Sequence, residues 1–347
     1  MMFRRLSLAV LAIAISSSSL AVAQAEDVLK VGIIGCDTSH VPAFTNAFSK
    51  AKPDSPLYGI RVVAAYPAGS KDVESSYTRV EGFTKTLRDQ GVEIVDSVEA
   101  LLPKVDAILL ESVDGRPHLA QAMPIFAANK ASAKKKPLFI DKPIAASLAD
   151  TLKIFKLAEE SGTPVFSTSS LRYYSDIASV HADGRFGDVV GCVSYGPCSL
   201  EEHHPDLFWY GIHGVEILFT IMGPGCESVS CTATKDTHVA TGVWSGGRVG
   251  TFRGIRSGKS GYGAVVFGTK TTGPTEDAAN KRSGGYEPML IEIAKFFRGG
   301  PAPVSPEVTI NLVAFMQAAE ESKRQGGKEV SIADVISAAE QSLSAGR

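Results

Sequence analysis

The sequence predicts an α/β protein with two folded parts: a doubly wound parallel sheet, and after it an α+β domain with an open, mainly antiparallel sheet. Three observations support this fold class. The 347 residues are enough for two domains of ordinary size. Up to about residue 170, short runs rich in β-branched residues alternate with helical stretches. Beyond that point, strands follow one another closely, with turn signals between them.

The first part has the alternation of strands and helices that is typical of right-handed βαβ units. Pro67 and Gly69 end the second strand, and Ser97 is placed to cap a short helix. The predicted strands are 28–35, 60–65, 92–95, 107–111, 137–140 and 164–167, and the predicted helices are a stretch through 44–48, then 74–90, 97–102, 118–129 and 148–161.

The second part reads as a meander of strands followed by helices. A turn such as Ser245-Gly246-Gly247 separates two of its strands. We therefore predict a signal peptide at 1–25, a first domain at 26–170 and a second domain at 171–347. The predicted strands are 189–195, 228–234, 239–244, 248–255 and 264–267, and the predicted helices are 288–297, 306–324 and a tail helix from 332.

The first residues have the features of a secretory leader. Arg4-Arg5 precedes an apolar run at 6–15, and a small-x-small site follows at 23–25. The run is about half the ~20 residues that span a bilayer, so we expect cleavage before Glu26 rather than a membrane span. The arginine pair also forms a partial twin-arginine pattern. We expect an exported protein, periplasmic or secreted.

Composition excludes some partners. The formal net charge is −2 and no stripe of Lys and Arg is present, so we expect no nucleic acid. The one basic run, 134–136, is typical of a solvated loop. The cysteine count is odd and no pair has metal or redox spacing, so we favour buried structural cysteines. The five cysteines are Cys36, Cys192, Cys198, Cys226 and Cys231.

The first strand-to-helix turn is where the pyrophosphate of a dinucleotide would bind. The usual pattern there is G-x-G-x-x-G, and only its first glycine, Gly35, is present. Asp37 would repel phosphates, whereas Thr38 and Ser39 offer hydroxyl donors and His40 can be cationic. Two interpretations stay open: a bound cofactor, or a remodelled loop that binds none.

The end of the second strand normally carries an acid that binds the ribose hydroxyls. Here Pro67 stands at about that place, and no acid follows until Asp72. Ser70 and Lys71 suit a 2′-phosphate better than a free hydroxyl, which favours NADP over NAD. The alternative is a plain Pro/Gly turn.

The stretch from Asp106 to Pro143 carries a more specific pattern. A helix opens at Pro117-His118, and a strand ends in Asp141-Lys142-Pro143. This arrangement resembles the Gfo/Idh/MocA oxidoreductases (glucose–fructose oxidoreductase, inositol dehydrogenase and MocA), in which a Glu-Lys-Pro tripeptide lies beside the nicotinamide of a Rossmann domain. The resemblance implies that Asp141 and Lys142 contact the cofactor and that Lys142 binds the substrate hydroxyl. An exposed lysine at a strand end is the alternative.

The family's second catalytic element is an Asp-x-Gly-x-His-x-x-Asp helix. The corresponding stretch is 209–216, in which Gly211 and His213 match and Glu216 stands for the distal acid. Trp209 replaces the proximal acid. The resemblance implies that His213 takes the hydroxyl proton while hydride leaves the same carbon. Loss of the orienting acid puts ordinary alcohol dehydrogenation in doubt.

A dense polar cluster lies just upstream, at 201–206. We rank substrate contacts first, surface polarity second and a metal third, because adjacent histidines on a loop point in different directions. Arg172 is either a substrate contact or a structural arginine. No metal site is predicted. The predicted substrate-binding residues are Arg172, His203, His204, Asp206 and Tyr210.

The resemblance implies an exported NAD(P)-dependent oxidoreductase that acts on a CH–OH group of a sugar, polyol or glycoside. Free NAD(P) is scarce outside the cytoplasm, so we expect a retained cofactor. The alternative is a non-redox descendant, either sugar-binding or of lyase or glycosidase type, that has lost or remodelled the nucleotide site. The exposed face of an open sheet favours a homo-oligomer.

Overall fold

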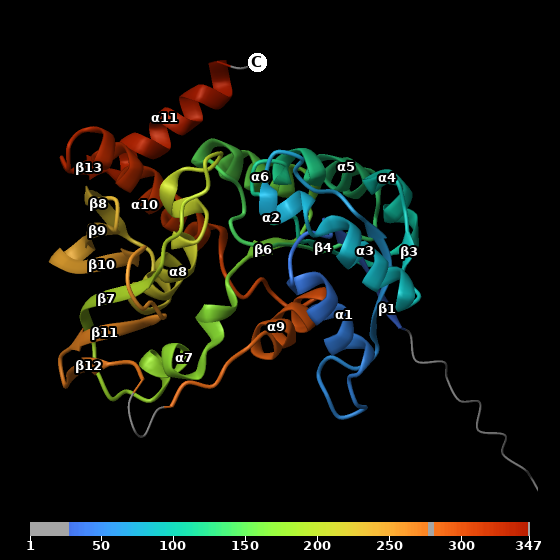
Figure 1. Cartoon of the computed structure of the whole chain (residues 1–347), viewed down its shortest axis with the longest axis horizontal. Helices are drawn as coiled ribbons and strands as arrows, with labels where there is room; N and C mark the ends of the chain where they lie inside the picture. The colour runs from blue at the N-terminus through green and yellow to red at the C-terminus, as the bar shows by residue number, and fades with distance from the viewer. Residues whose placement is uncertain (1–27, 277–280, 346–347) are drawn as a thin grey trace, which may run out of the picture.

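The computed structural model describes residues 28–276 and 281–345. Its elements form two sheets with helices packed against them, and the parallel sheet lies nearer the N-terminus (Figure 1). The predicted fold class is confirmed. The predicted signal peptide falls outside the described residues. None of the helices in the described ranges is long and apolar enough to cross a membrane.

The first sheet has six parallel strands in the order β3-β2-β1-β4-β5-β6. Because β1 lies between β2 and β4, the strand order reverses there, and ligands of such sheets bind at the carboxyl ends beside this point. The strands are β1 (Leu29–Ile34), β2 (Ile60–Tyr66), β3 (Glu93–Ile94), β4 (Ala107–Leu110), β5 (Leu138–Ile140) and β6 (Val165–Ser167).

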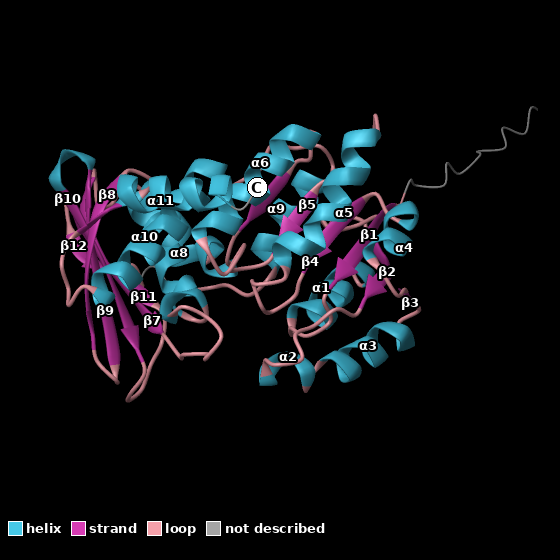
Figure 2. Cartoon of the chain, turned by 90° about the horizontal axis from the view of Figure 1, so that it is seen from above, coloured by secondary structure: helices cyan, strands magenta, loops and turns pink. Residues whose placement is uncertain are grey.

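Helices cover both faces of the parallel sheet (Figure 2). Successive strand residues point to opposite faces, so Ile33 belongs to one buried core and Ile34 to the other. The helices are α1 (His40–Ser49), α2 (Glu74–Tyr77), α3 (Val80–Asp89), α4 (Val98–Leu101) with the 3₁₀ turn η1 (Leu102–Lys104), α5 (His118–Ala131) and α6 (Leu148–Ser161).

The second sheet has seven strands in the order β12-β11-β7-β10-β9-β8-β13, antiparallel except for the β7–β10 pair. Helices α8 and α10 contact it. Its strands are β7 (Val189–Pro197), β8 (Cys226–Ala233), β9 (Thr237–Trp244), β10 (Arg248–Ile255), β11 (Gly263–Gly268), β12 (Thr272–Pro274) and β13 (Val330–Ser331).

One helix of the second part returns to the first. α9 buries Leu290 and Ile293 in the core that also holds Phe44 of α1 and Phe139 of β5, a return that the division at residue 170 does not anticipate. The helical elements from the junction onward are η2 (Ser170–Tyr173), α7 (Ser175–Ala182), η3 (Asp206–Phe208), α8 (Gly211–Met222), η4 (Ser245–Gly247), α9 (Glu287–Phe297), α10 (Pro306–Arg324) and α11 (Ile332–Ala345).

The structure corrects the prediction of one long helix at 74–90. The chain forms α2 and α3 instead, separated at Thr78-Arg79. At the break, the backbone amide of Arg79 donates to the carbonyl of Ser76, three residues back, so the helical ladder of bonds between residues four apart is interrupted. Helix α7 and strands β12 and β13 were not predicted. All five cysteines are free and buried, which agrees with the interpretation that the sequence favoured.

Candidate functional site

A cavity of about 830 Å³ lies where the two parts meet. Its walls include the start of α1, Lys142 after β5, and Tyr210 and His213 at the start of α8. The volume is within the usual range for small-molecule sites, and the position is the carboxyl edge of the parallel sheet. The topology therefore brings the first turn, the predicted catalytic lysine and the predicted catalytic histidine to one cavity.

The first turn retains donors for an anion. Gly35 has φ of +88°, and a Cβ there would lie 2.4 Å from the backbone nitrogen of Ser112, so only glycine fits. In the described part of the chain, no acceptor is recorded for the backbone amides of Thr38 and Ser39, and both residues line the cavity. Free amides at the start of α1 suit a phosphate group.

Asp37 is buried beneath the turn and does not line the cavity. Its carboxylate accepts hydrogen bonds from the amide of Val113 at 2.9 Å and the hydroxyl of Ser76 at 2.6 Å. Burial, more than any neighbour, raises the pKa of Asp37 to about 6. The sequence led us to expect this carboxylate near the phosphates of a cofactor. Instead, the side chain ties the first turn to Ser76 in α2 and to Val113 after β4.

The loops beside the expected adenosine site are bonded to each other. The Ser70 hydroxyl donates to Asp114 at 2.5 Å, and the Arg116 guanidinium donates to both oxygens of Asp72 at 2.9 Å. Asp72 lines the cavity, whereas Ser70 and Lys71 do not. The residues present therefore fit the phosphates and the nicotinamide end of a dinucleotide. The acid that would bind its ribose is already engaged by Arg116.

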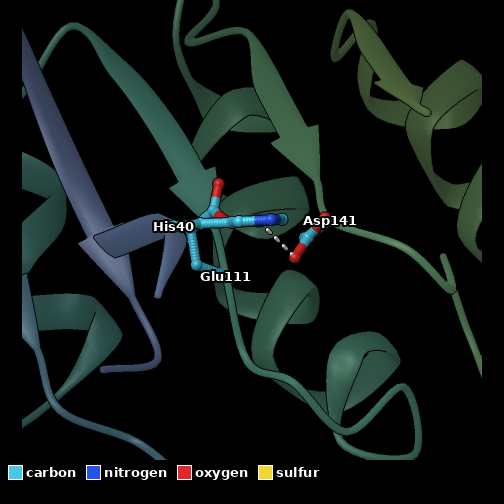
Figure 3. Close-up of side chains that lie close together, drawn as sticks. All are labelled: His40, Glu111 and Asp141. Atoms are coloured by element: carbon cyan, nitrogen blue, oxygen red, sulfur yellow. Dashed lines mark ion pairs between the residues drawn. The ribbon is translucent and has the colours of Figure 1, made fainter. Parts of the chain in front are cut away.

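Three ionisable side chains, from the start of α1 and from the ends of β4 and β5, lie close together (Figure 3). His40 Nδ1 lies 2.9 Å from Asp141 Oδ2 and 3.4 Å from Glu111 Oε2, and all three residues are buried. Burial opposes the charge on His40, but the two carboxylates outweigh it and raise its pKa to about 10. Burial, and then Asp141, raises the pKa of Glu111 to about 7. The sequence analysis missed Glu111.

Lys142 and His213 both line the cavity. Lys142 Nζ lies 3.8 Å from Asp141 Oδ2. His213 Nδ1 is hydrogen-bonded to the Ser169 hydroxyl at 2.8 Å. Burial, and then the positive charge of Lys142, lowers the pKa of His213 to about 3, so its imidazole is neutral at neutral pH.

Neither residue at the two acid positions of the family pattern orients His213. Glu216 accepts instead from Arg172 Nε at 2.6 Å and from the Thr168 hydroxyl at 2.8 Å. Trp209, in the proximal position, lies with its ring 4.9 Å from that of His204. Ser169 is thus the hydrogen-bond partner of His213 in this structure, and the sequence did not single it out.

The loop 201–204 connects the two parts of the molecule. His204 Nε2 lies 2.9 Å from Asp114 Oδ1, and its Nδ1 lies 2.6 Å from Glu201 Oε2. His203 Nδ1 bonds the other Glu201 oxygen at 2.8 Å. Asp206 lies elsewhere and accepts from Lys323 at 2.6 Å. His204 therefore holds the loop against Asp114 in the first part of the chain, and His203 Nε2 lies 3.6 Å from Asp72 Oδ2.

Only some of the predicted site residues reach the cavity. The predicted residues in its lining are Thr38, Ser39, His40, Lys142, Tyr210 and His213. The predicted residues outside that lining are Gly35, Asp37, Ser70, Lys71, Asp141, Arg172, His203, His204 and Asp206. Glu111 could have been found from its place, because the carboxyl ends of the neighbouring strands β4 and β5 meet at one edge.

Comparison with known proteins identifies a related family. Residues 29–169 match the model of the GFO_IDH_MocA family, described as an oxidoreductase family with an NAD-binding Rossmann fold. Residues 29–169 are therefore similar to the NAD-binding Rossmann domain of this oxidoreductase family, and the predicted resemblance is confirmed over this part of the chain. The search among curated proteins found no match.

Solved structures share the fold over most of the chain. An oxidoreductase from Agrobacterium radiobacter, in complex with NAD⁺, L-tartaric acid and magnesium, is 18% identical, with a TM-score of 0.68 over 88% of this chain and 99% of that one. Myo-inositol dehydrogenase from Lactobacillus casei, with NAD(H) and myo-inositol, is 16% identical, with a TM-score of 0.66 over 88% and 96%. Scyllo-inositol dehydrogenase from Lactobacillus casei is 15% identical, with a TM-score of 0.65 over 88% and 99%.

Proposed function

We propose that this protein is an exported NAD(P)-dependent oxidoreductase that acts on a CH–OH group of a sugar, polyol or glycoside. One observation carries the proposal: a single cavity joins the free amides of Thr38 and Ser39 to Lys142 and His213. Backbone amides that can donate hydrogen bonds to phosphates at one place, and two side chains that can bind or transfer a proton at another, suit a dinucleotide that lies between them.

The chain's residues have separable tasks. The amides at the start of α1 bind the pyrophosphate, and Lys142 binds the reacting hydroxyl at the carboxyl edge of the sheet. His213, neutral and held by Ser169, forms a hydrogen bond with the same hydroxyl. A bound nicotinamide supplies the hydride acceptor. Because Lys142 carries the positive charge that lowers the pKa of His213, we assign Lys142 the stabilisation of the developing alkoxide and the neutral imidazole of His213 the acceptance of the hydroxyl proton.

The substrate class follows from the polar and aromatic walls. The rings of Tyr210 and Tyr262 lie beside that of His213, and Glu202 lines the same cavity, so hydroxyl and carboxylate groups are present that suit a polyhydroxylated ligand. The neighbours named above were solved with inositols or with tartaric acid, which also carry several hydroxyls. The preference for NADP remains a prediction: Arg79 in the cavity wall favours a 2′-phosphate, and Asp72 opposes it.

Export and assembly complete the proposal. The leader at 1–25 supports export, and an exported enzyme would need to keep its cofactor through the catalytic cycle. A homo-oligomer is supported by an exposed apolar row on the second sheet. Val243, Val249 and Phe267 lie there on neighbouring strands, joined in register through Gly191.

A second candidate function has its own observation. The bonds Asp37–Val113, Ser70–Asp114 and Arg116–Asp72 tie together the loops between which an adenosine would bind. This favours the alternative in which the nucleotide site has been remodelled, leaving a sugar-binding protein or a lyase that uses Lys142 and His213 for proton transfer alone.

The test begins with the purified protein. Denaturation should release about one equivalent of nicotinamide, detected by absorbance and fluorescence, or added NAD or NADP should bind with the same stoichiometry. Turnover on a panel of polyols, inositols and glycosides should then require Lys142, and Lys142→Ala should abolish it while the unfolding curve stays unchanged. Absence of both retained and added cofactor binding would reject the redox function in favour of the second candidate.

A further inference from the structure

The buried cluster of His40, Glu111 and Asp141 lacks the hydrogen bonds that its charges require. Within the described residues, His40 Nδ1, both oxygens of Glu111 and Asp141 Oδ2 are inaccessible to solvent and have no hydrogen-bond partner. The 2.9 Å contact between His40 and Asp141 lies off the direction of the ring N–H, so it does not satisfy either atom. The ion pairs with His40 leave these carboxylate oxygens without a hydrogen bond, which is costly for buried groups and which a bound cation would relieve.

The spacing of these atoms is that of ligands around one ion. Two ligands about 2.1 Å from a shared metal lie about 3.0 Å apart at a right angle and about 3.4 Å apart at the tetrahedral angle. The observed separations from His40 Nδ1 are 2.9 Å to Asp141 and 3.4 Å to Glu111. One ligand atom from each residue can be chosen so that all lie within 4.8 Å of one another. Atoms that point at a third atom between them also explain the bent contact.

We propose that His40, Glu111 and Asp141 bind a divalent transition-metal ion, Mn²⁺ or Zn²⁺, through the imidazole Nδ1 and one oxygen of each carboxylate. The donor set decides the class of metal. Two carboxylates favour hard cations such as Mn²⁺, and the imidazole favours a transition metal over Ca²⁺ or Mg²⁺. The two negative charges also balance the charge of the ion.

The proposed metal site lies next to the cavity. His40 lines the cavity, and Lys142, beside Asp141, lines it too. Three protein ligands leave positions for a substrate hydroxyl or a water molecule, as in catalytic metal sites. A hydroxyl bound there becomes more acidic and lies next to Lys142. The site does not depend on hydride transfer, because it would serve a lyase equally well.

A second cluster of similar composition has its carboxylates paired with a protein cation, although His238 Nε2 there also lacks a hydrogen-bond partner. Asp206, His238 and Glu320 also lie within ligand distance of one another. There, however, the ammonium of Lys323 lies 2.6 Å from Asp206 and 3.6 Å from Glu320, and Arg256 contacts the other nitrogen of His238. Protein cations already occupy that cluster. At the cluster beside the cavity, Lys142 remains 3.8 Å from the nearest carboxylate oxygen.

The experiment measures metal binding directly. The full chain, freed of metal with a chelator, is titrated with Mn²⁺ while the electron paramagnetic resonance signal of the free ion is recorded, and with Zn²⁺ in competition with a chromophoric chelator. We expect one equivalent to bind per chain. Glu111→Gln, which keeps the shape of the side chain, should weaken binding at least 100-fold, as should His40→Ala. Glu320→Gln, in the second cluster, is the matched control and should bind as the wild type does.

Loss of metal binding can be distinguished from misfolding. Glu111→Gln removes a carboxylate from the like-charged pair with Asp141, so without metal it should unfold no more easily than the wild type, which excludes misfolding as the cause of lost binding. Failure of the wild type to bind either ion stoichiometrically, or equal binding by the wild type and Glu111→Gln, would overturn the proposal. Neither result bears on cofactor binding, which is measured separately with NAD or NADP.

Discussion

Replacement of Arg172 by Met tests whether this arginine is structural. Arg172 lies in η2, at the junction of the two parts, and its Nε is 2.6 Å from Glu216 Oε1 in α8. The side chains are 15% and 5% exposed, so solvent screens the pair poorly. Loss of the arginine leaves the Glu216 carboxylate with the Thr168 hydroxyl alone. Breaking a buried pair on one side costs about 3–5 kcal/mol, and we expect Arg172→Met to destabilise the protein by about that amount.

The assay is equilibrium unfolding in urea, followed by circular dichroism, for Arg172→Met, Glu216→Met and the double variant. Since removal of both partners leaves no unpaired charge, the double variant should be closer to the wild type than the sum of the single effects, with a coupling of at least about 2 kcal/mol. A loss below about 1 kcal/mol for Arg172→Met, with a raised KM for substrate, would refute this reasoning and favour the substrate role that the sequence suggested.

Three further predictions follow. Gly35→Ala should destabilise the protein by at least about 2 kcal/mol in urea unfolding, because the φ of Gly35 is +88° and the new Cβ would meet Ser112. Gly82→Ala, in α3 with open space around it, is the control and should stabilise the protein by about 0.5–1 kcal/mol. Equal effects of the two substitutions would contradict the tight first turn. Burial raises the pKa of Asp114, but its hydrogen bonds outweigh burial and hold the pKa well below its usual range. The stability that this carboxylate contributes is therefore present above about pH 4 and is lost as the pH falls further. Asp114→Asn should flatten the acid limb of the curve of stability against pH, and an unchanged limb would contradict the role of this carboxylate. Lys142→Ala should lower kcat at least about 100-fold with little change in unfolding, and near-normal turnover would remove Lys142 from the reaction.

The sequence predicted the strands and most helices because their apolar periodicity is local. Strand β10 and helices α6 and α10 have the predicted limits. The sequence could not predict that α9 packs on the first part of the chain, because the apolar face of an amphipathic helix does not indicate which surface it will cover. The prediction of a single helix at 74–90 was wrong because the backbone ladder is interrupted at Arg79, which the hydrophobic pattern does not indicate.

The candidate site was predictable where it depends on topology and less so where it depends on side-chain direction. Lys142 follows a strand of the parallel sheet, so its place at the carboxyl edge followed from the fold. Asp37 was placed in the correct turn, but its carboxylate points to Ser76 and Val113, which only the packed loops reveal. His204 Nε2 likewise lies 2.9 Å from Asp114 Oδ1 across 90 residues of sequence, a contact that no local pattern encodes.

Titration with NADH tests the central claim most directly. The chain has two tryptophans, of which Trp209 lines the cavity and Trp244 is fully buried in the second domain. If a dinucleotide binds along the start of α1 with its nicotinamide near Lys142, one equivalent of NADH should quench the tryptophan emission and gain emission by energy transfer, and Trp209→Phe should abolish most of that response. Unchanged emission at millimolar NADH, together with no heat of binding by calorimetry, would contradict the assignment of this cavity to a nicotinamide cofactor.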